Sequence, residues 1–167
     1  MTSISTPAER ARRLAELGLT LAPVPALDTL AGELAADLNA PYAMVNLITD
    51  RQTFTGLRTP PGSDLPPVDR TMSLEHGYCP ALLDRRKALV LPDVCAVPRF
   101  AGNPVVDQIG IRSYAGAPLF DPDTCMVLGT VCAVGTGARP ASTARDTLQM
   151  IKRHRDRVWQ VLASTAG

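Results

Sequence analysis

The stretch VLPDVCAVPRFAGNPVV occupies residues 90–106, and two shorter apolar blocks follow it: IRSYAGAPL at 111–119 and VLGTVCAV at 127–134. The long stretch begins like a strand and turns irregular at Pro92, yet it stays unusually apolar for a surface loop. The two shorter blocks have the length and composition of buried strands, and DPD at 121–123 is typical of a hairpin turn. This region therefore predicts a strand, an irregular apolar segment and an antiparallel strand pair.

The chain before and after this region alternates helical and strand patterns. Apolar residues at three- and four-residue spacing predict a helix over 27–38. Apolar runs predict strands at 42–49 and 52–57, joined by a tight turn. Four prolines make 58–75 irregular, and such long loops in compact domains are commonly functional. The other expected elements are helices at 8–17, 76–84 and 143–163, strands at 88–91, 112–119 and 126–134, and an irregular segment at 93–110.

This order of elements predicts the fold class. Strands joined by short turns favour an antiparallel sheet over a doubly wound parallel one. Helices from both chain ends can pack on one face, and the irregular segments then cover the other. The fold class is therefore α/β (α+β), with a central antiparallel sheet between these two layers.

Composition excludes several classes of function. The 167 residues carry a net charge of +1 and are 46% hydrophobic, so no strong field attracts nucleic acid or an anionic membrane. The basic run at 152–157 is interpreted as a solvated helix face rather than a nucleic-acid patch. No apolar run approaches the ~20 residues of a membrane helix, and the polar start lacks a signal peptide. We expect a soluble cytoplasmic protein.

Cysteine spacing gives no metal motif. The four cysteines form no C-x-x-C pair, and free thiols are the norm in a reducing cytosol. The chain also lacks a G-x-S-x-G, a Walker loop and an H-E-x-x-H motif. We therefore expect no metal and no hydrolase or transferase chemistry.

Three motifs taken together carry a resemblance to a known family. PDxxxxPRFxxNPxV at 92–106, YAGxPL at 114–119 and LGTxC at 128–132 follow one another in this order. In this respect the chain resembles the GAF domain family over residues 27–163. The resemblance implies a GAF/PAS-like sheet with terminal helices on one face and a ligand pocket on the other, roofed by 72–84 and 93–110. We expect a GAF domain at 26–164 after an N-terminal helical extension at 1–25.

Strand alternation indicates which side chains face that pocket. Tyr42, Met44, Asn46 and Ile48 share one face of their strand, and their phenol, thioether and amide groups suit a cavity with a few polar contacts. Likewise, alternation groups Met126, Leu128, Thr130 and Cys132 on one face. The expected ligand-binding residues are Met44, Asn46, Phe54, Met72, His76, Cys79, Phe100, Tyr114 and Cys132.

The resemblance implies a small-molecule sensor that signals through a separate protein partner and is not an enzyme. The ligand and any cofactor are unknown. The Asn-Lys…Phe…Asp-Glu signature of cyclic-nucleotide-binding relatives is absent, and Cys79 precedes proline rather than the histidine of bilin-binding relatives. Haem would need His76 or His154 as its axial ligand, and four percent aromatic residues is low for a haem pocket.

Two alternatives stay open. One is a thiol-based redox switch, or an enzyme like free methionine sulfoxide reductase, that uses Cys79 and Cys95. The reductase nucleophile belongs at 103–107, a stretch that holds no cysteine here. The other is a ligand-free scaffold. For any of these, the apolar seam of the last helix predicts a homodimer through residues 8–38 and 143–163, unless that seam packs on its own sheet.

Overall fold

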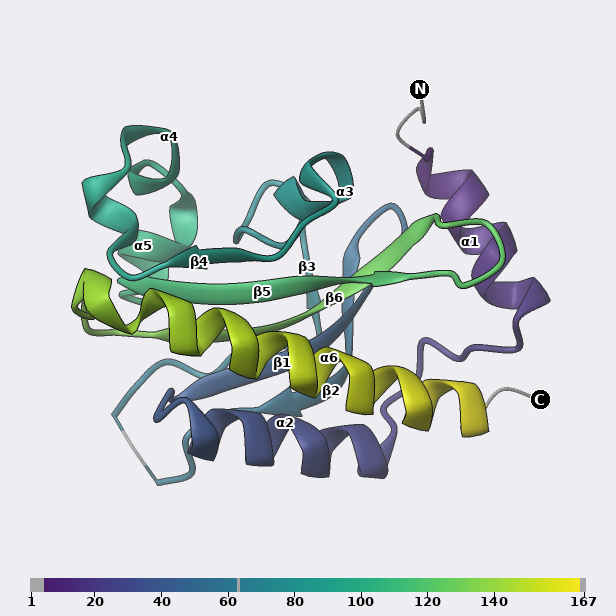
Figure 1. The fold of residues 1–167 in the computed structure, drawn as a ribbon, viewed down its shortest axis with the longest axis horizontal. Coiled ribbons are helices and arrows are strands. Elements are labelled where there is room, and N and C mark those ends of the chain that lie inside the picture. Colours follow the sequence, from purple (N-terminus) through teal and green to yellow (C-terminus); the bar gives the residue numbers. More distant parts are fainter. Residues whose placement is uncertain (1–4, 63, 166–167) are drawn as a thin grey trace.

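The computed structural model describes residues 5–62 and 64–165. Its centre is a six-stranded antiparallel sheet in the order β3-β2-β1-β6-β5-β4 (Figure 1). The α+β class and both predicted hairpins, β1–β2 and β5–β6, are confirmed. The strands are β1 (Tyr42–Ile48), β2 (Gln52–Arg58), β3 (Thr71–Met72), β4 (Leu89–Leu91), β5 (Ser113–Phe120) and β6 (Val127–Gly135).

Helices cover the two faces of the sheet differently (Figure 1). On one face α2 packs against β1 and β2, while α6 packs against β5 and β6. Short helices cover the other face, and α1 contacts β1 and β6. No helix of the described ranges combines the length and the apolar character that crossing a bilayer requires. The helices are α1 (Pro7–Glu16), α2 (Pro25–Asp37), α3 (Ala81–Arg85), η1 (Val94–Ala96), α4 (Pro98–Ala101), α5 (Pro104–Gln108), η2 (Ala141–Thr143) and α6 (Ala144–Thr165).

Alternation along the central strands divides the apolar interior into two cores. In β1, Ala43, Val45 and Leu47 belong to the core beneath α2 and α6. Their neighbours Tyr42 and Met44 belong to the core beneath the short helices. The facing that the sequence predicted for β1 is therefore confirmed, and the larger, more polar side chains face the side where a pocket was expected.

Two arginines attach α1 to the end of the sheet. The buried Arg10 guanidinium donates to the carbonyl oxygens of Ile48, at 2.7 Å, and Thr49, at 3.0 Å. Arg13 donates through two nitrogens to the carboxylate of Asp121, which is fully buried in the β5–β6 turn. Thr124 and the backbone N–H of Asp123 donate to the same carboxylate. The N-terminal helix is thus held by buried polar contacts as well as by apolar packing.

This cluster predicts an acid-sensitive contribution to stability. Burial raises the pKa of Asp121, but hydrogen bonds from Arg13, Thr124 and Asp123 outweigh it, so the pKa lies below its usual value. The stabilisation is therefore complete above the carboxyl pKa of the unfolded chain and is lost as pH falls through the lower folded value. We expect Asp121→Asn to be less stable at neutral pH and to lose less stability on acidification. Urea unfolding measured from neutral to acidic pH checks this.

An exposed carboxylate provides the matched control. Asp107→Asn removes a carboxylate from an exposed position on α5 and should reproduce the acid limb of the unmodified protein. Equal acid limbs for Asp121→Asn and the unmodified protein would contradict the assignment.

Several element predictions need correction. The predicted helix at 76–84 is shorter, because residues 73–80 form turns and only Ala81–Arg85 is helical. Within 58–75, Thr71–Met72 pairs with β2 as the short edge strand β3. The irregular segment at 93–110 contains three short helices, η1, α4 and α5. Asp93 and Asn103 cap two of them by accepting from the backbone N–H groups of Cys95 and Val105.

The predicted facing of β6 is correct at its end and wrong at its start. Thr130 and Cys132 lie on the pocket side as expected. Leu128 and Met126 instead pack in the core beneath α2 and α6. The ladder with β5 shifts register here, pairing Leu119 with Gly129 and Phe120 with Val127. The shift leaves Leu128 unpaired, and such a bulge reverses the alternation on its far side.

The seam of α6 packs on the sheet of its own chain. Ile151, Val158 and Leu162 are buried in the core beneath the helices, and Leu148 and Arg155 are half-buried. The apolar seam of α6 is therefore buried within one chain and is not free to pair two chains. The homodimer through 8–38 and 143–163 stays a prediction, and this seam does not support it. His154, which the sequence placed on a solvated face, is buried, and its Nε2 lies 2.7 Å from a carboxylate oxygen of Asp37.

Candidate functional site

A hollow lies between the sheet and two segments that cover it. The first roof segment is residues 72–84 and the second is 93–110, as the sequence predicted. The cavity volume is about 30 Å³, which is room for one or two waters. Its lining consists of Tyr42, Met44, Gln52, Phe54, Val68, Met72, Gly77, Tyr78, Cys79, Val105, Ile109, Ile111, Tyr114, Cys132 and Val134.

Sulfur atoms and a phenol meet at the centre of this hollow. The Cys79 Sγ lies 3.2 Å from the hydroxyl of Tyr114, and the Cys132 Sγ lies 3.7 Å from the Met44 Sδ. The register of the sheet explains the meeting, because Met44 is paired with Cys132 across β1 and β6. The buried thiols of Cys79 and Cys132 are neighbours, and each influences the pKa of the other. The cluster therefore joins the floor of the hollow to the first roof segment.

The two thiols have opposite acid–base properties. Burial raises the pKa of Cys79, but its interactions with neighbouring polar groups, Cys132 and Tyr114 among them, outweigh burial, so the pKa lies below its usual value. The interaction with Cys79 and burial together raise the pKa of Cys132 well above its usual value. Of this pair, Cys79 is the more acidic thiol, and the thiolate is the reactive form of cysteine.

Two neighbouring polar groups beneath the hollow have no partner. The side-chain amide of Asn46 donates to the Oε1 of Gln52 at 2.8 Å. Its own oxygen, Asn46 Oδ1, and the hydroxyl of Thr130, its register partner on β6, are buried without a hydrogen bond among the described residues. Leaving buried polar groups unpaired costs free energy, but neither residue lines the hollow itself.

Gln52 fixes the first roof segment to the floor. Its buried amide donates to the backbone carbonyls of Ser73, at 2.8 Å, and His76, at 2.6 Å. Because the Oε1 of the same side chain accepts from Asn46, all polar atoms of Gln52 are in use. The side chain therefore links the floor of the hollow to the backbone that covers it.

Two further contacts join the roof segments to each other. The Asn103 side chain accepts from the N–H of Gly77 at 2.9 Å and donates to the carbonyl of Gly77 at 2.8 Å. The hydroxyl of Tyr78 donates to the carbonyl of Phe100 at 2.9 Å, and its ring packs edge-on against Phe100 and Tyr114. Burial raises the pKa of Tyr78 to about 12, so this hydroxyl remains a donor. The two segments therefore form one connected cover.

The structure separates the nine predicted binding residues into three groups. Asn46 is buried on the floor next to Gln52. Phe100 packs in the roof on Tyr78, and His76 is half-buried with its carbonyl bonded to Gln52. Six residues line the hollow itself: Met44, Phe54, Met72, Cys79, Tyr114 and Cys132.

Sequence reasoning missed part of the lining. Gln52 opens β2 after a tight turn, and no pattern indicated that its amide points inward. Val105 and Ile109 lie in the segment predicted as irregular, and their facing could not be predicted, since a loop has no alternation. The contact of Asn103 with Gly77 also left no signal in the sequence, because it depends on a fold that brings distant segments together.

Cys95 does not join the buried thiols. It is exposed on η1, whereas Cys79 is buried and its sulfur contacts Tyr114 and Cys132. The thiol that neighbours Cys79 in this structure is therefore Cys132, and a Cys79/Cys95 pair stays a prediction.

Charge is absent from the hollow. Of the described residues that line it, none is Asp, Glu, Lys, Arg or His. Among the described residues there is also no group of three His, Cys, Asp or Glu side chains placed to hold a metal ion. A buried charge without a partner is strongly unfavourable, so this site suits an uncharged molecule with few polar groups.

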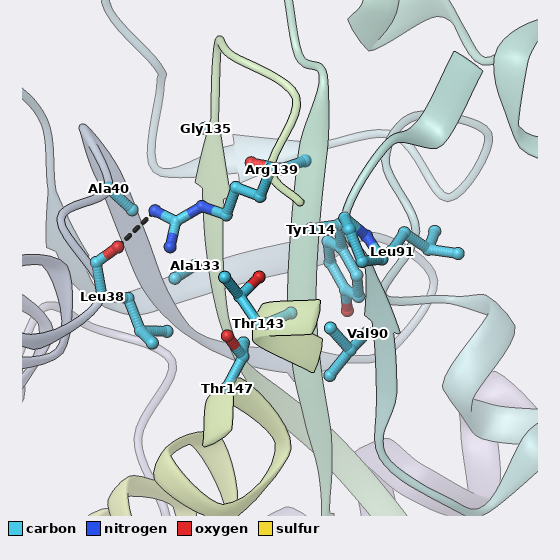
Figure 2. Close-up of a pocket in the computed structure, with 13 residues that line it drawn as sticks. Leu38, Ala40, Val90, Leu91, Tyr114, Ala133, Gly135, Arg139, Thr143 and Thr147 are labelled. Carbon is cyan, nitrogen blue, oxygen red and sulfur yellow. Dashed lines mark hydrogen bonds between the residues drawn. The ribbon is translucent and has the colours of Figure 1, made fainter. Parts of the chain in front are cut away.

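A second hollow lies on the face covered by helices, and Figure 2 shows its lining. Arg139 extends across it and donates to the carbonyl oxygens of Leu38 and Asn39, the two residues that follow α2. Apolar side chains such as Val90 and Ala133 form much of the wall. The Arg139 guanidinium therefore caps the end of α2, where carbonyl groups lack helical partners. The volume of this second hollow is only about 20 Å³.

Comparisons with known proteins agree on one family. A model of the GAF domain family matches residues 23–159. No curated protein matches the chain. Among solved structures, the GAF domain of an Acinetobacter phosphoenolpyruvate-protein phosphotransferase superposes with a TM-score of 0.61 at 14% identity, covering 98% of this chain and 96% of that one.

Two further structures carry different chemistry on a similar fold. A free methionine-R-sulfoxide reductase from Neisseria meningitidis, in complex with its substrate, has a TM-score of 0.56 at 15% identity, covering 96% of this chain and 99% of that one. The phycocyanobilin-bound GAF domain of a cyanobacterial phytochrome has a TM-score of 0.62 at 15% identity, covering 98% and 97%. At these identities the likeness shows the fold alone.

Proposed function

Because the chain belongs to the GAF domain family, we propose that it is a sensory protein that binds a small, uncharged and mainly apolar molecule between the sheet and the roof segments. The observation that carries this proposal is the buried hollow without charged lining. Two of the similar structures, the bilin-bound domain and the reductase with its substrate, hold small molecules on this fold. The protein acts on a separate partner and is not itself an enzyme.

The chemistry of the hollow defines the ligand class. Tyr114, Met44 and the apolar side chains of α5 and β6 offer contact with an apolar body. A phosphate or a carboxylate would be buried without a cation, which is unfavourable. The ligand is therefore neutral and mainly apolar.

Ligand binding requires the roof to move. The hollow of about 30 Å³ is much smaller than the roughly 300–1,000 Å³ clefts that hold typical ligands. A bound molecule therefore displaces the first or second roof segment, and the contacts of Asn103 and Gln52 oppose this displacement. A ligand that binds only the displaced form shifts the population toward it, and that shift is the signal.

A thiol redox function is the second candidate, because Cys79 and Cys132 are buried, free and close enough to influence each other, and the pKa of Cys79 is lowered. Two thiols and one peroxide would give a disulfide and two waters. A reductase of free methionine sulfoxide is less favoured, since its zwitterionic substrate carries two charges and the described lining carries none.

Thermal unfolding with neutral and zwitterionic compounds tests the proposal. Native mass spectrometry of freshly purified protein first identifies co-purified ligand. A neutral ligand at a hundred times its Kd should raise Tm by about 5–10 °C. Ile109→Trp adds bulk at the lining and should abolish the rise, whereas Leu21→Trp, at an exposed position, should keep it.

Two results would oppose the proposal. The first is stabilisation and turnover of free methionine sulfoxide, which would indicate the reductase. The second is the loss of two hydrogens from the protein mass after mild peroxide, with no response to any neutral compound, which would indicate the redox switch.

A further inference from the structure

A basic hollow lies at the β4 edge of the sheet, away from the ligand pocket. Its volume is about 370 Å³. Five cationic side chains surround it, out of 17 lysines and arginines in the chain. They come from the end of α3, the turn before β4 and the middle of α6: Arg85, Arg86, Lys87, Lys152 and Arg155.

These cations are nearly free of carboxylates. Among the described residues, the ion pair between Arg155 and Asp156 is the only one that involves any of the five. Like charges gathered in one place repel one another, and an anionic partner relieves that repulsion. Because the net charge of the chain is only +1, this basic cluster is a local feature rather than a property of the whole surface.

Arg86 is held in an unusual conformation at this site. Its φ of 60° is left-handed, a conformation that favours glycine. Its guanidinium lies over the Phe120 ring, 5.3 Å from the centroid, and donates to the carbonyl of Cys125 at 2.7 Å. These two contacts hold the Arg86 guanidinium in place at the rim of the hollow despite the backbone cost.

The floor of the hollow is apolar. Between the cations lie Ala88, Pro118, Phe120 and Leu148. A concave site with an apolar floor and cationic walls matches a chain segment that carries both carboxylates and apolar side chains. A nucleic-acid backbone offers regular phosphates but no apolar side chain for this floor.

From these observations we infer that the basic hollow is the docking site for an acidic, partly apolar segment of a partner protein. The carboxylates pair with Lys87, Lys152 and their neighbours, and an apolar side chain lies on Phe120 and Leu148. The chain also runs directly from Cys79 in the pocket through α3 to Arg85. Displacement of the first roof segment would therefore move three of the five cations, a step that rests on the proposed ligand pocket.

Fluorescence anisotropy with a labelled peptide of alternating glutamate and leucine tests the docking site without any pocket ligand. The double variant Lys87→Glu/Lys152→Glu should weaken binding about tenfold or more. Arg51→Glu/Arg153→Glu is the matched control, because it changes the same charge at exposed positions outside the hollow and should retain binding within about twofold. Replacing the leucines of the peptide with serine should also weaken binding, because it removes contact with the floor.

Three outcomes would overturn the inference. Equal weakening by the control variant would show an effect of overall charge. Equal binding of the serine peptide would remove the role of the floor. Tighter binding of duplex DNA with the same dependence on Lys87 and Lys152 would identify a nucleic-acid surface. Because no pocket ligand is present, none of these results bears on the ligand-binding proposal.

Discussion

Gly129→Ala is expected to lower the free energy of unfolding by more than about 3 kcal/mol. A Cβ atom at this position would lie 1.9 Å from the carbonyl oxygen of Asn46 and 3.0 Å from the Cα of Leu47. Both atoms belong to the backbone of β1, a central strand with buried neighbours on both sides. Backbone in the middle of a sheet cannot yield as a flexible side chain can, so the strands must separate and lose part of their packing.

A second glycine gives a control of opposite sign. Gly32 lies inside α2, and nothing stands within 4 Å of the Cβ that alanine would add. Because glycine inside a helix is less favourable than alanine by up to about 1 kcal/mol, Gly32→Ala should raise the free energy of unfolding by that order. Urea unfolding of both variants measures the effects. Wild-type stability of Gly129→Ala would contradict the close approach of β1 and β6.

Alternation explains why much of the sheet could be predicted from the sequence. The side chains of β1 alternate between small apolar residues such as Ala43 and larger ones such as Met44. The small residues of β1 therefore face the helices, which pack closely on them. The large residues face the roof segments, which leave space for them. The same regularity ended at Leu128, where an unpaired residue shifts the register. A bulge has no signal in a single sequence when both faces of the strand are buried.

The roof could be located but not described from the sequence. Prolines marked the irregular segments, and apolar residues within them indicated burial. The contacts that hold the roof join residues far apart in the chain, as Asn103 does with Gly77 and Cys79 with Tyr114. Spacing carries no information on such pairs. For this reason the sequence grouped Cys79 with Cys95 and did not indicate that Cys132 is its neighbour.

His154 shows the same limit on a regular element. Its charged neighbours on α6 predicted a solvated face, but the helix turns His154 inward toward Asp37 of α2. The position follows the spacing of Ile151 and Val158, at three and four residues. The helical spacing alone therefore predicts that His154 is buried. The interpretation as a solvated face gave more weight to the charge of the adjacent residues.

Gln52→Leu is expected to lower the free energy of unfolding by about 3 kcal/mol and to release the first roof segment. The substitution keeps most of the side-chain volume but removes three hydrogen bonds. The carbonyl of His76 and the amide of Asn46 would then lose this partner, and the carbonyl of Ser73 would keep only the N–H of His76. Each unpaired group costs about 1–3 kcal/mol unless water reaches it.

Opening of the first roof segment costs less free energy than unfolding of the sheet, so we expect the variant to open locally. If residues 73–80 move outward, the freed carbonyls reach solvent while the sheet keeps its packing. Hydrogen exchange should therefore quicken at the backbone amides of His76 and Gly77, which donate to Ser73 and Asn103, and stay slow in the β5–β6 hairpin. Gln149→Leu, at an exposed position on α6, should leave both regions unchanged.

The same variant links stability to ligand binding. If a ligand must displace the roof, a roof already released by Gln52→Leu should bind more tightly, because less work is needed to open it. A variant that is less stable and yet binds the neutral ligand more tightly than the unmodified protein would distinguish a roof that gates the pocket from a roof that is only structural. Weaker binding, with exchange unchanged at Gly77, would show that Gln52 supports the floor alone and that ligand entry does not depend on displacement of residues 73–80.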